Sequence, residues 1–271
     1  MPETATGIAY DHTELSSSSS QVLFIHAGMA DRRMWDRQWE RLHQTFGMTR
    51  LDLRGFGDST TPPPLGSFSH AQDVIDTMGE MELDQAHLVG SSFGAGVAVE
   101  VALLAPKRIE SLVVCPPGGS LLAILTDTLR DFFAAEREAL QAGDLDAAVE
   151  ANVRAWLVGG NRTIDDVDPA AVEQVRRMQR RAFEAAEQLG NAEEVELDPP
   201  ALERLADVVA PTLVLVGGHD MDTVHDAAER LAAGIPTVST IEWPTVAHLP
   251  SLEEPDRFTA LLRNWIADLS R

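Results

Sequence analysis

Short apolar runs alternate along the chain with longer segments in which apolar residues recur every three or four positions. The runs at residues 22–25, 109–114 and 213–216 have the length and composition of strands that are buried on both faces of a sheet. The periodic segments, such as residues 69–81 and 255–269, predict amphipathic helices. Because strands and helices alternate, the pattern predicts an α/β fold with a mostly parallel central sheet flanked by helices.

The same pattern gives expected bounds for the remaining elements. Expected strands cover residues 7–15, 22–25, 49–53, 109–114, 213–216 and 237–243, and a further strand ends at residue 89. Expected helices cover residues 34–46, 69–81, 97–104, 223–233 and 255–269. The polar run Ser16–Ser20 has no apolar anchor and predicts a mobile surface loop.

The alternation stops in the middle of the chain, where no strand signal appears. Three helices are expected there, over residues 121–142, 144–156 and 168–189. Asp168 followed by Pro169 is typical of an N-cap and a first helical residue. A helical insertion between two strands of a parallel sheet is most simply a lid over one edge of that sheet. The expected organisation is a core of residues 1–116 and 201–271 with a helical lid (cap) of residues 117–200.

One serine lies where a predicted strand turns sharply into a predicted helix. Gly90 and Gly94 flank Ser92 at two residues on either side, which gives the pattern G-x-S-x-G. Such a turn forces its central residue towards positive φ, and the flanking residues must be small for the backbone to pass. A glycine-rich turn that only packs a helix against a strand would give the same letters. The strand before and the helix after favour a nucleophile elbow.

Two backbone N–H groups are candidates for an oxyanion hole beside this serine. Phe93 begins the helix after the elbow, so its N–H group points towards the Ser92 hydroxyl. Gly28 follows the apolar run at residues 22–25 and would let the chain turn until the Met29 N–H group faces the site.

A serine hydroxyl needs an imidazole to take its proton and a carboxylate to orient that imidazole. Asp220 and His248 each follow a predicted strand, so both belong at the carboxyl edge of the sheet with Ser92. Taken alone, Asp220 could cap a helix and His248 could be a core histidine. The order Ser92, Asp220, His248 is the one expected for a catalytic triad in this architecture.

Other residues compete for these roles with weaker support. Asp222 is a second candidate acid that better suits a helix cap, and Ser91 lacks the flanking glycines. His26 opens the glycine loop, where a histidine more often fixes the backbone by hydrogen bonds. A metal site at His219, Asp220, Asp222 and His225 matches no common ligand spacing and would compete with the triad.

Composition narrows the classes of partner. The chain has 271 residues and a formal net charge of -22, which disfavours nucleic acids and anionic membranes as partners. A single cysteine, Cys115, excludes an intramolecular disulfide and a cysteine-based zinc site, so a reducing cytoplasm fits best. The first residues show no signal peptide, and no apolar run is long enough for a membrane span.

These motifs together resemble the α/β-hydrolase fold superfamily, and the resemblance covers nearly the whole chain. The matching stretches are His26-Ala27-Gly28-Met29, Asp52-Leu53-Arg54-Gly55-Phe56-Gly57-Asp58-Ser59, Gly90-Ser91-Ser92-Phe93-Gly94, Gly217-Gly218-His219-Asp220 and Ala247-His248-Leu249-Pro250-Ser251-Leu252-Glu253-Glu254-Pro255. The compact lid and the stretch Arg33-Met34-Trp35-Asp36 look most like the enol-lactonase, haloperoxidase-like and carboxylesterase branch.

The sequence departs from the usual family pattern at two positions, and a third position argues against two of the family's branches. Family members often have Gly where Ala27 stands and Met where Phe93 stands. The first change narrows the oxyanion loop, and the second places a flat ring against the acyl pocket. Ser at position 92 argues against haloalkane dehalogenases and epoxide hydrolases, which attack through a carboxylate.

The expected activity is hydrolysis of a small-to-medium, largely apolar carboxylic ester or lactone through an acyl-enzyme on Ser92, with no cofactor. Carbon–carbon bond hydrolysis, perhydrolysis and lyase chemistry use the same triad in relatives, and a non-catalytic small-molecule receptor is a third class. A monomer or a homodimer is expected. The expected walls of the substrate pocket are Met34, Trp35, Phe132, Phe133, Trp156 and Met178.

Overall fold

The structure is a computed structural model that describes residues 2–15, 20–63 and 66–269. Most of the predicted surface loop Ser16–Ser20 lies outside the described residues. Within those three ranges, no helix combines the length and the apolar character needed to cross a membrane.

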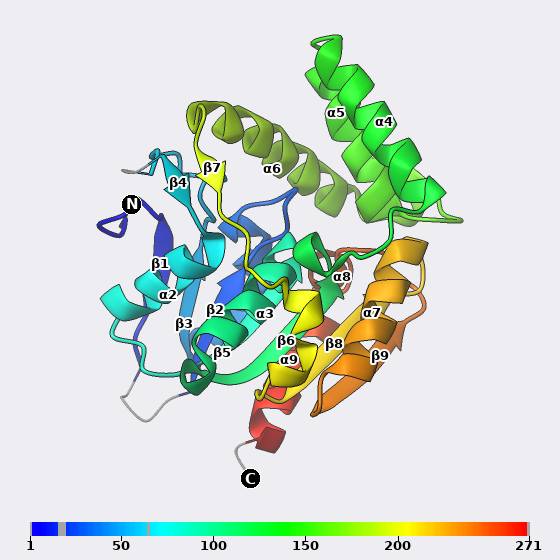
Figure 1. Ribbon diagram of the computed structural model, residues 1–271. Helices are drawn as coiled ribbons and strands as arrows, with labels where there is room; N and C mark the ends of the chain where they lie inside the picture. Colours follow the sequence, from blue (N-terminus) through cyan, green and yellow to red (C-terminus); the bar gives the residue numbers. More distant parts are fainter. Residues whose placement is uncertain (1, 16–19, 64–65, 270–271) are drawn as a thin grey trace.

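A seven-stranded sheet forms the centre of the molecule, with the order β1-β3-β2-β5-β6-β8-β9 (Figure 1). Its strands are β1 (Tyr10–Thr13), β2 (Gln21–Ile25), β3 (Gly47–Leu51), β5 (Ala86–Ser92), β6 (Ile109–Pro117), β8 (Thr212–Gly217) and β9 (Val238–Trp243). β1 runs antiparallel to β3, and the other neighbouring pairs are parallel. The mostly parallel sheet predicted from the sequence is therefore confirmed.

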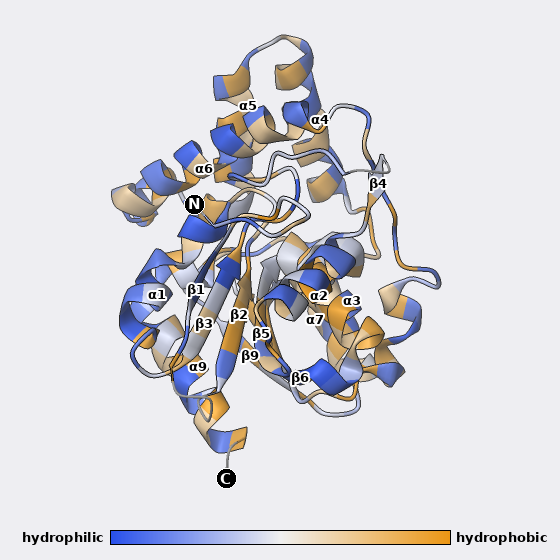
Figure 2. Ribbon diagram, turned by 90° about the vertical axis from the view of Figure 1, so that its left-hand side faces the viewer, coloured by the Kyte–Doolittle hydropathy of each residue, from blue (hydrophilic) through white to orange (hydrophobic). Residues whose placement is uncertain are grey.

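Helices cover both faces of this sheet (Figure 2). One face carries α1 (Asp36–Leu42) and α9 (Pro255–Leu269), and the other carries α2 (His70–Glu80), α3 (Phe93–Leu104) and α7 (Asp222–Gly234). Successive side chains of a strand point to opposite faces, so Val22 and Phe24 pack with α1 and α9, while Leu23 and Ile25 pack with α2 and α3. Full burial of each such side chain stabilises the fold by about 1.5–3 kcal/mol.

The only cysteine of the sequence lies on β6, in the core on the side of the sheet that carries α1 and α9. Cys115 is 0% exposed, and its thiol donates to the Gly90 carbonyl oxygen over 3.2 Å. Because burial disfavours the thiolate, the pKa of Cys115 lies above its usual range. The thiol is protonated and closed to reagents in the folded chain.

Three long helical segments fill the interval between β6 and β8, beyond the carboxyl ends of the strands (Figure 1). They are α4 (Asp127–Gln141), α5 (Leu145–Asn152), which continues as the π-helical η4 (Val153–Val158), and α6 (Pro169–Gln188). Asp168 accepts a hydrogen bond from the Ala170 N–H group at 2.9 Å, so the predicted N-cap is confirmed. The first helix begins at residue 127 instead of 121, because the Thr126 hydroxyl supplies its N-cap.

Several short elements escaped the sequence prediction. They are the 3₁₀ turns η1 (Arg32–Trp35), η2 (Pro106–Arg108), η3 (Gly119–Leu121), η5 (Ile164–Asp166), η6 (Ala201–Glu203) and η7 (Leu205–Asp207), the helix α8 (Pro250–Glu253), and a two-stranded parallel sheet of β4 (Ser67–Phe68) and β7 (Glu193–Glu194). The predicted helix over residues 34–46 is divided between η1 and α1 and ends at Leu42. The predicted strand over residues 7–15 shortens to β1.

Candidate active site

The turn between β5 and α3 has the backbone geometry that the glycine spacing predicts. Ser92 adopts φ 53° and ψ -117°, a region that side chains with a β-carbon rarely occupy. A Cβ added to Gly90 would lie 2.4 Å from the Gly94 carbonyl oxygen, and one on Gly94 would lie 2.4 Å from the His26 carbonyl oxygen. Both glycines are therefore required for the chain to make this turn.

The structure brings Ser92, His248 and Asp220 into one hydrogen-bonded chain. His248 Nε2 lies 2.7 Å from Ser92 Oγ, and His248 Nδ1 lies 2.7 Å and 2.9 Å from the two carboxylate oxygens of Asp220. Nδ1–H donates to the carboxylate, so Nε2 is free to accept the hydroxyl proton. This is the geometry that an activated serine requires.

The carboxylate of Asp220 is held at its position by the backbone as well as by the imidazole. The Met221 N–H group donates to Asp220 Oδ1 at 2.8 Å. The side chains of Asp220 and His248 are almost fully buried, with 0% and 2% of their surface exposed. The His248 N–H group donates to the Trp156 carbonyl oxygen at 3.1 Å. The imidazole is thus fixed from the side chain and from the main chain.

The two loops expected to supply the oxyanion hole pack directly against each other. A Cβ added to Gly28 would lie 3.3 Å from Phe93 Cβ, so the loop after β2 touches the first residue of α3. Met29 is 5% exposed on that loop. The Met29 N–H group has no acceptor within the described part of the chain, which leaves it available to a ligand.

His26 fixes this loop and takes no part in the triad. The Leu53 N–H group donates to His26 Nε2 at 2.9 Å, and His26 Nδ1 lies 2.8 Å from the Ala27 carbonyl oxygen. Full burial is the largest influence on this imidazole and lowers its pKa. A neutral histidine therefore joins the loop after β3 to the Met29 loop, and the sequence predicts such a role in fixing the backbone.

The other residues considered for the triad and for a metal site do not take these roles in the structure. Asp222 accepts from the Thr126 hydroxyl at 2.8 Å and from the Thr223 N–H group at 2.9 Å, so its carboxylate does not reach His248. It is the first residue of α7 and not the cap before it, because Met221 occupies the N-cap position. Ser91 is fully buried. Across the residues that the structure describes, no group of three or more His, Cys, Asp or Glu side chains could hold a metal ion.

Comparison with known proteins assigns this architecture to a family. A family model described as the alpha/beta hydrolase family matches residues 22–261, which is most of the chain. The chain belongs to the alpha/beta hydrolase family. Both the resemblance read from the motifs and the expected fold class are thereby confirmed.

Individual relatives of this hydrolase are distant but match over nearly their full length. A 3-oxoadipate enol-lactonase of Acinetobacter baylyi is 23% identical over 248 residues, covering 92% of this chain and 89% of its own. A pimeloyl-[acyl-carrier protein] methyl ester esterase of Nitrosomonas europaea is 24% identical, covering 92% and 96%. A thermophilic esterase of Thermogutta terrifontis has a TM-score of 0.76 at 26% identity, with 97% and 93% covered.

Two of the six expected wall residues of the hydrolase lie beside the triad. The ring centroid of Trp156 is 4.5 Å from that of His248, and Phe132 packs edge-on against Trp156 at 5.2 Å. Both residues come from the segment between β6 and β8, Phe132 from α4 and Trp156 from η4.

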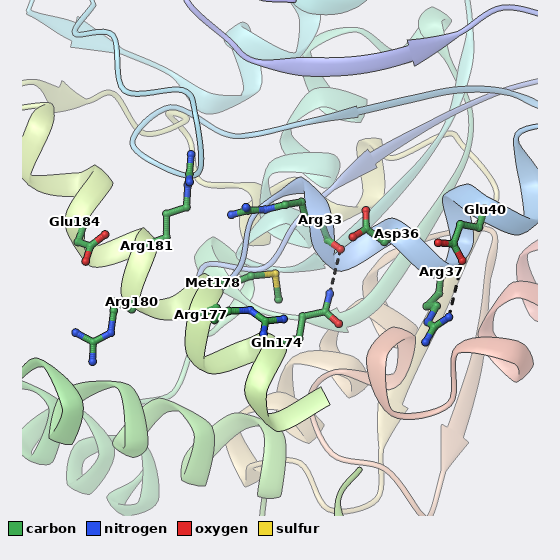
Figure 3. Close-up of a pocket in the computed structure, with 10 residues that line it drawn as sticks. All are labelled: Arg33, Asp36, Arg37, Glu40, Gln174, Arg177, Met178, Arg180, Arg181 and Glu184. Atoms are coloured by element: carbon green, nitrogen blue, oxygen red, sulfur yellow. Dashed lines mark hydrogen bonds and ion pairs between the residues drawn. The ribbon is translucent and has the colours of Figure 1, made fainter. Parts of the chain in front are cut away.

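The structure places the other four expected wall residues in different surroundings, and Met34 Sδ accepts a hydrogen bond from the Ala27 N–H group of the loop after β2 at 3.3 Å. Met34 and Trp35 are fully buried in the core, where the Trp35 ring packs on Phe24 at 5.1 Å and on Phe258 at 6.0 Å. Phe133 is 44% exposed on the outer side of α4. Met178 lines a groove between α1 and α6 (Figure 3). Helical periodicity shows which residues are apolar, but it does not distinguish a core-facing side chain from one that faces a ligand.

A cavity of 330 Å³ begins at Phe93 and Gly119, next to the elbow, and its lining is more acidic than the sequence suggested. Its carboxylates are Glu100, Glu194 and Glu196. Burial, followed by the neighbouring carboxylates, raises the pKa of Glu194 to about 7. None of the six expected wall residues lines this cavity.

Gly118 is a neighbour of Ser92 that the sequence reading missed. A Cβ at this position would lie 2.7 Å from Ser92 Oγ and equally close to the Ser92 backbone. Gly118 follows β6, the strand that pairs with β5 on the other side from β2. The signal was present in Pro116-Pro117-Gly118-Gly119 at the end of a strand next to the elbow.

Arg162 also escaped the sequence reading, and it ties the segment carrying Trp156 to the loop carrying His248. Its guanidinium donates to the Leu157 and Val158 carbonyl oxygens at 2.8 Å and 2.7 Å, and to the Thr245 carbonyl oxygen at 3.0 Å. It also pairs with Glu253 at 2.7 Å, and this pair is nearly buried, with 9% and 5% of the two side chains exposed.

Glu253 completes the connection on the histidine side. Its Oε1 accepts a hydrogen bond from the Ala247 N–H group at 2.9 Å, immediately before His248. Burial raises the pKa of Glu253, and Arg162 acts against that rise by stabilising the carboxylate. Arg162 and Glu253 therefore fix the histidine loop and η4 relative to each other.

Proposed function

We propose that this hydrolase cleaves a small-to-medium, largely apolar carboxylic ester or lactone through an acyl-enzyme on Ser92. The observation that carries the proposal is the unbroken contact from Ser92 Oγ through both nitrogens of His248 to the buried Asp220 carboxylate. A hydroxyl at a strained elbow with such a base is an activated nucleophile.

In the first half of the proposed reaction, His248 Nε2 takes the hydroxyl proton while Ser92 Oγ bonds to the substrate carbonyl carbon. The carbonyl oxygen becomes an oxyanion, which the N–H groups of Met29 and Phe93 stabilise. Asp220 stabilises the imidazolium that forms. The tetrahedral intermediate then expels the alcohol oxygen, which receives the proton from His248.

In the second half, water replaces the alcohol. His248 Nε2 takes one proton of the water as its oxygen bonds to the acyl carbon. Collapse of this second intermediate breaks the bond to Ser92 Oγ, and the proton returns from His248 to the serine. The products are a carboxylic acid, the alcohol released earlier and the regenerated hydroxyl.

The surroundings of the triad support a compact substrate with a neutral acyl part. The rings of Trp156 and Phe132 give an apolar wall beside His248. The carboxylates around the cavity at Phe93 disfavour a substrate that brings its own carboxylate to that side. The names of the two curated relatives, an enol-lactonase and a methyl ester esterase, also describe bonds at a carbonyl with an oxygen leaving group.

Residues 117–200 are proposed to act as the lid of the site. Support comes from their position beyond the carboxyl ends of the strands (Figure 1) and from the contact of Trp156 with His248. A covering segment that touches the general base can exclude water from the reacting groups and shape the pocket.

The test is labelling with a fluorophosphonate, followed by intact-mass measurement and peptide mapping. The wild type is expected to take up one adduct on Ser92, and Ser92→Ala and His248→Ala are expected to take up none. Ser91→Ala is the matched control, because it removes a buried hydroxyl without a partner among the described residues. The probe should label this control, and the control should hydrolyse an aryl ester, at rates within about twofold of those of the wild type.

An adduct on any other residue, or none on the wild type, would contradict the serine-nucleophile proposal. If Ser92 is labelled but no ester or lactone of a panel is hydrolysed, Ser92 remains the proposed nucleophile and the proposed substrate class is excluded. The panel should therefore include short acyl chains, with and without a terminal carboxylate.

A further inference from the structure

A groove of 650 Å³ lies between α1 and α6, and arginine side chains dominate its lining (Figure 3). The arginines are Arg33, Arg37, Arg177, Arg180 and Arg181. Five guanidinium groups stand there with three carboxylates, in a chain whose formal net charge is -22. The lining residues of the groove thus include more cationic than anionic side chains, although the protein as a whole is acidic.

The walls of this groove are fixed to each other. The Gln174 side-chain amide donates to the Arg33 carbonyl oxygen at 3.1 Å, which joins α6 to η1 (Figure 3). Arg181 donates to the Gly57 carbonyl oxygen at 3.2 Å and forms an ion pair with Asp58, which joins α6 to the loop after β3. A ligand would therefore meet a preformed site, with little ordering left to oppose binding.

Two of the five guanidinium groups lack a close carboxylate. Arg37 Nη1 is 3.8 Å from Glu40 Oε2, and Arg177 Nη1 is 3.7 Å from Glu173 Oε1, both beyond hydrogen-bond distance. The two arginine side chains are 62% and 68% exposed, so these ion pairs contribute little. Arg37 extends from α1 and Arg177 from α6, on the two sides of the groove (Figure 3).

The other arginines have close partners. Arg33 binds Asp31, with Arg33 Nε 2.8 Å from Asp31 Oδ1, yet its side chain is still 47% exposed. Arg180 pairs with Asp146 and points away from α1 (Figure 3). The positive charge available to a ligand therefore lies chiefly on Arg37 and Arg177.

Two of the three carboxylates in the groove oppose an anion only weakly, and the third, Glu40, lies 3.8 Å from Arg37 Nη1 and competes with an anion for that guanidinium. Asp36 Oδ1 lies 2.5 Å from Arg50 Nη1, so its charge is already neutralised. Glu184 stands at the far end of α6 from Arg37 (Figure 3). Acidic groups elsewhere on the molecule are screened, since the Debye length is about 8 Å at physiological ionic strength.

We propose that this groove binds a small multivalent oxyanion, a compound with two or more carboxylate or phosphate groups, between Arg37 and Arg177. Arginine forks match both kinds of oxygen group, and each of these two guanidinium groups is exposed and only loosely paired. The site is separate from Ser92, so the proposal holds whatever bond the hydrolase cleaves.

The ligand would connect the core to the segment between β6 and β8. Because it contacts α1 and α6 together, it stabilises the arrangement in which these helices lie against each other. Binding is therefore expected to raise the thermal midpoint and to slow amide exchange along α6.

The experiment is isothermal titration of the full chain with citrate and, separately, with inorganic pyrophosphate in about 20 mM NaCl. At least one is expected to bind at a single site, and the double variant Arg37→Gln/Arg177→Gln should weaken it about tenfold or more. The matched control is Arg130→Gln/Arg230→Gln, which removes the same charge from exposed ion pairs on α4 and α7. This control should change the affinity less than about twofold.

The two probes distinguish the source of the oxyanion. Binding of citrate alone identifies a polycarboxylate site, binding of pyrophosphate alone identifies a phosphate site, and binding of both shows recognition by charge. Single variants Arg37→Gln and Arg177→Gln, checked by circular dichroism, should each lose part of the affinity. Absence of binding by both anions, or an equal loss in the control, would overturn the proposal.

Discussion

His70 is the first residue of α2, and its imidazole lies among aromatic rings. Its ring packs edge-on against Phe68 at 4.9 Å and against Phe93 at 5.1 Å, and the residue is 4% exposed. Loss of water is the main reason why the pKa of His70 falls to about 3. Although Glu194 lies 3.8 Å away, this histidine is neutral near pH 7, so their contact is not an ion pair at that pH.

The pKa of His70 predicts a loss of stability in mild acid. Between about pH 3 and 6.5 the unfolded chain binds a proton at His70 that the folded chain refuses, so the free energy of unfolding decreases as the pH falls below 6.5. Relative to His70→Phe, the wild type should lose about 1.5 kcal/mol between pH 6.5 and pH 5. Urea titrations at a series of pH values measure this difference.

Glu194 has the opposite effect on the pH dependence of stability. Its pKa is raised to about 7 in the folded chain, so its contribution to the free energy of unfolding increases as the pH falls. Its carboxylate is present in both proteins, so the comparison with His70→Phe largely cancels its contribution. A difference that stays constant with pH would show that His70 is not held neutral by its surroundings.

At the scale of the element, the strands of the central sheet and the loops carrying Ser92, Asp220 and His248 were predictable, and the details of the helices were not. Continuous apolar runs and the glycines around Ser92 identify buried strands and a sharp turn by local rules alone. Trp35 is buried in the core against Phe258, which is far away in the sequence. Helical periodicity therefore could not distinguish this core residue from Trp156, which lies beside His248. Two-residue strands such as β4 have no alternation to detect.

The connection through Arg162 depends on long-range contacts of the same kind, and it predicts an effect on turnover. If Ser92 acts as proposed, Arg162→Met should lower kcat for an aryl ester about tenfold with little change in KM, because η4 and the His248 loop lose their common anchor. Steady-state kinetics across a pH series measure this effect. The matched control is Arg176→Met, which removes an exposed ion pair with Glu150.

A second variant separates positioning from stability. Arg162→Met alone leaves the buried Glu253 carboxylate unpaired, which is expected to destabilise the fold by about 3–5 kcal/mol. Arg162→Met/Glu253→Gln removes that charge and should recover much of the stability while kcat stays low. Full recovery of kcat in this double variant would show that the ion pair serves stability only.

At the scale of the whole molecule, charge is the dominant feature. Asp and Glu number 43 against 21 Lys and Arg, and the isoelectric point is about 4.6. Repulsion among like charges opposes the compact state, and salt screens it. The groove between α1 and α6 is an exception to this field, because its arginines come together only when the two helices do.

Salt should therefore stabilise the folded chain at neutral pH. Raising NaCl from about 20 mM to about 200 mM is expected to raise the thermal midpoint by about 3 °C at pH 7.5. Differential scanning calorimetry measures the shift. The increment should fall by about half or more at pH 5, near the isoelectric point, and an equal increment at both pH values would rule out self-repulsion as its cause.

The reactivity of Cys115 reports how often the centre of the sheet opens. Its thiol lies fully buried on β6 and donates to Gly90, two residues before the proposed nucleophile. A thiol reagent can modify it only after the centre of the sheet has opened, so the rate of modification counts opening events beside the elbow. With no second thiol in the sequence, that rate belongs to one position, and it can be followed without introducing any label.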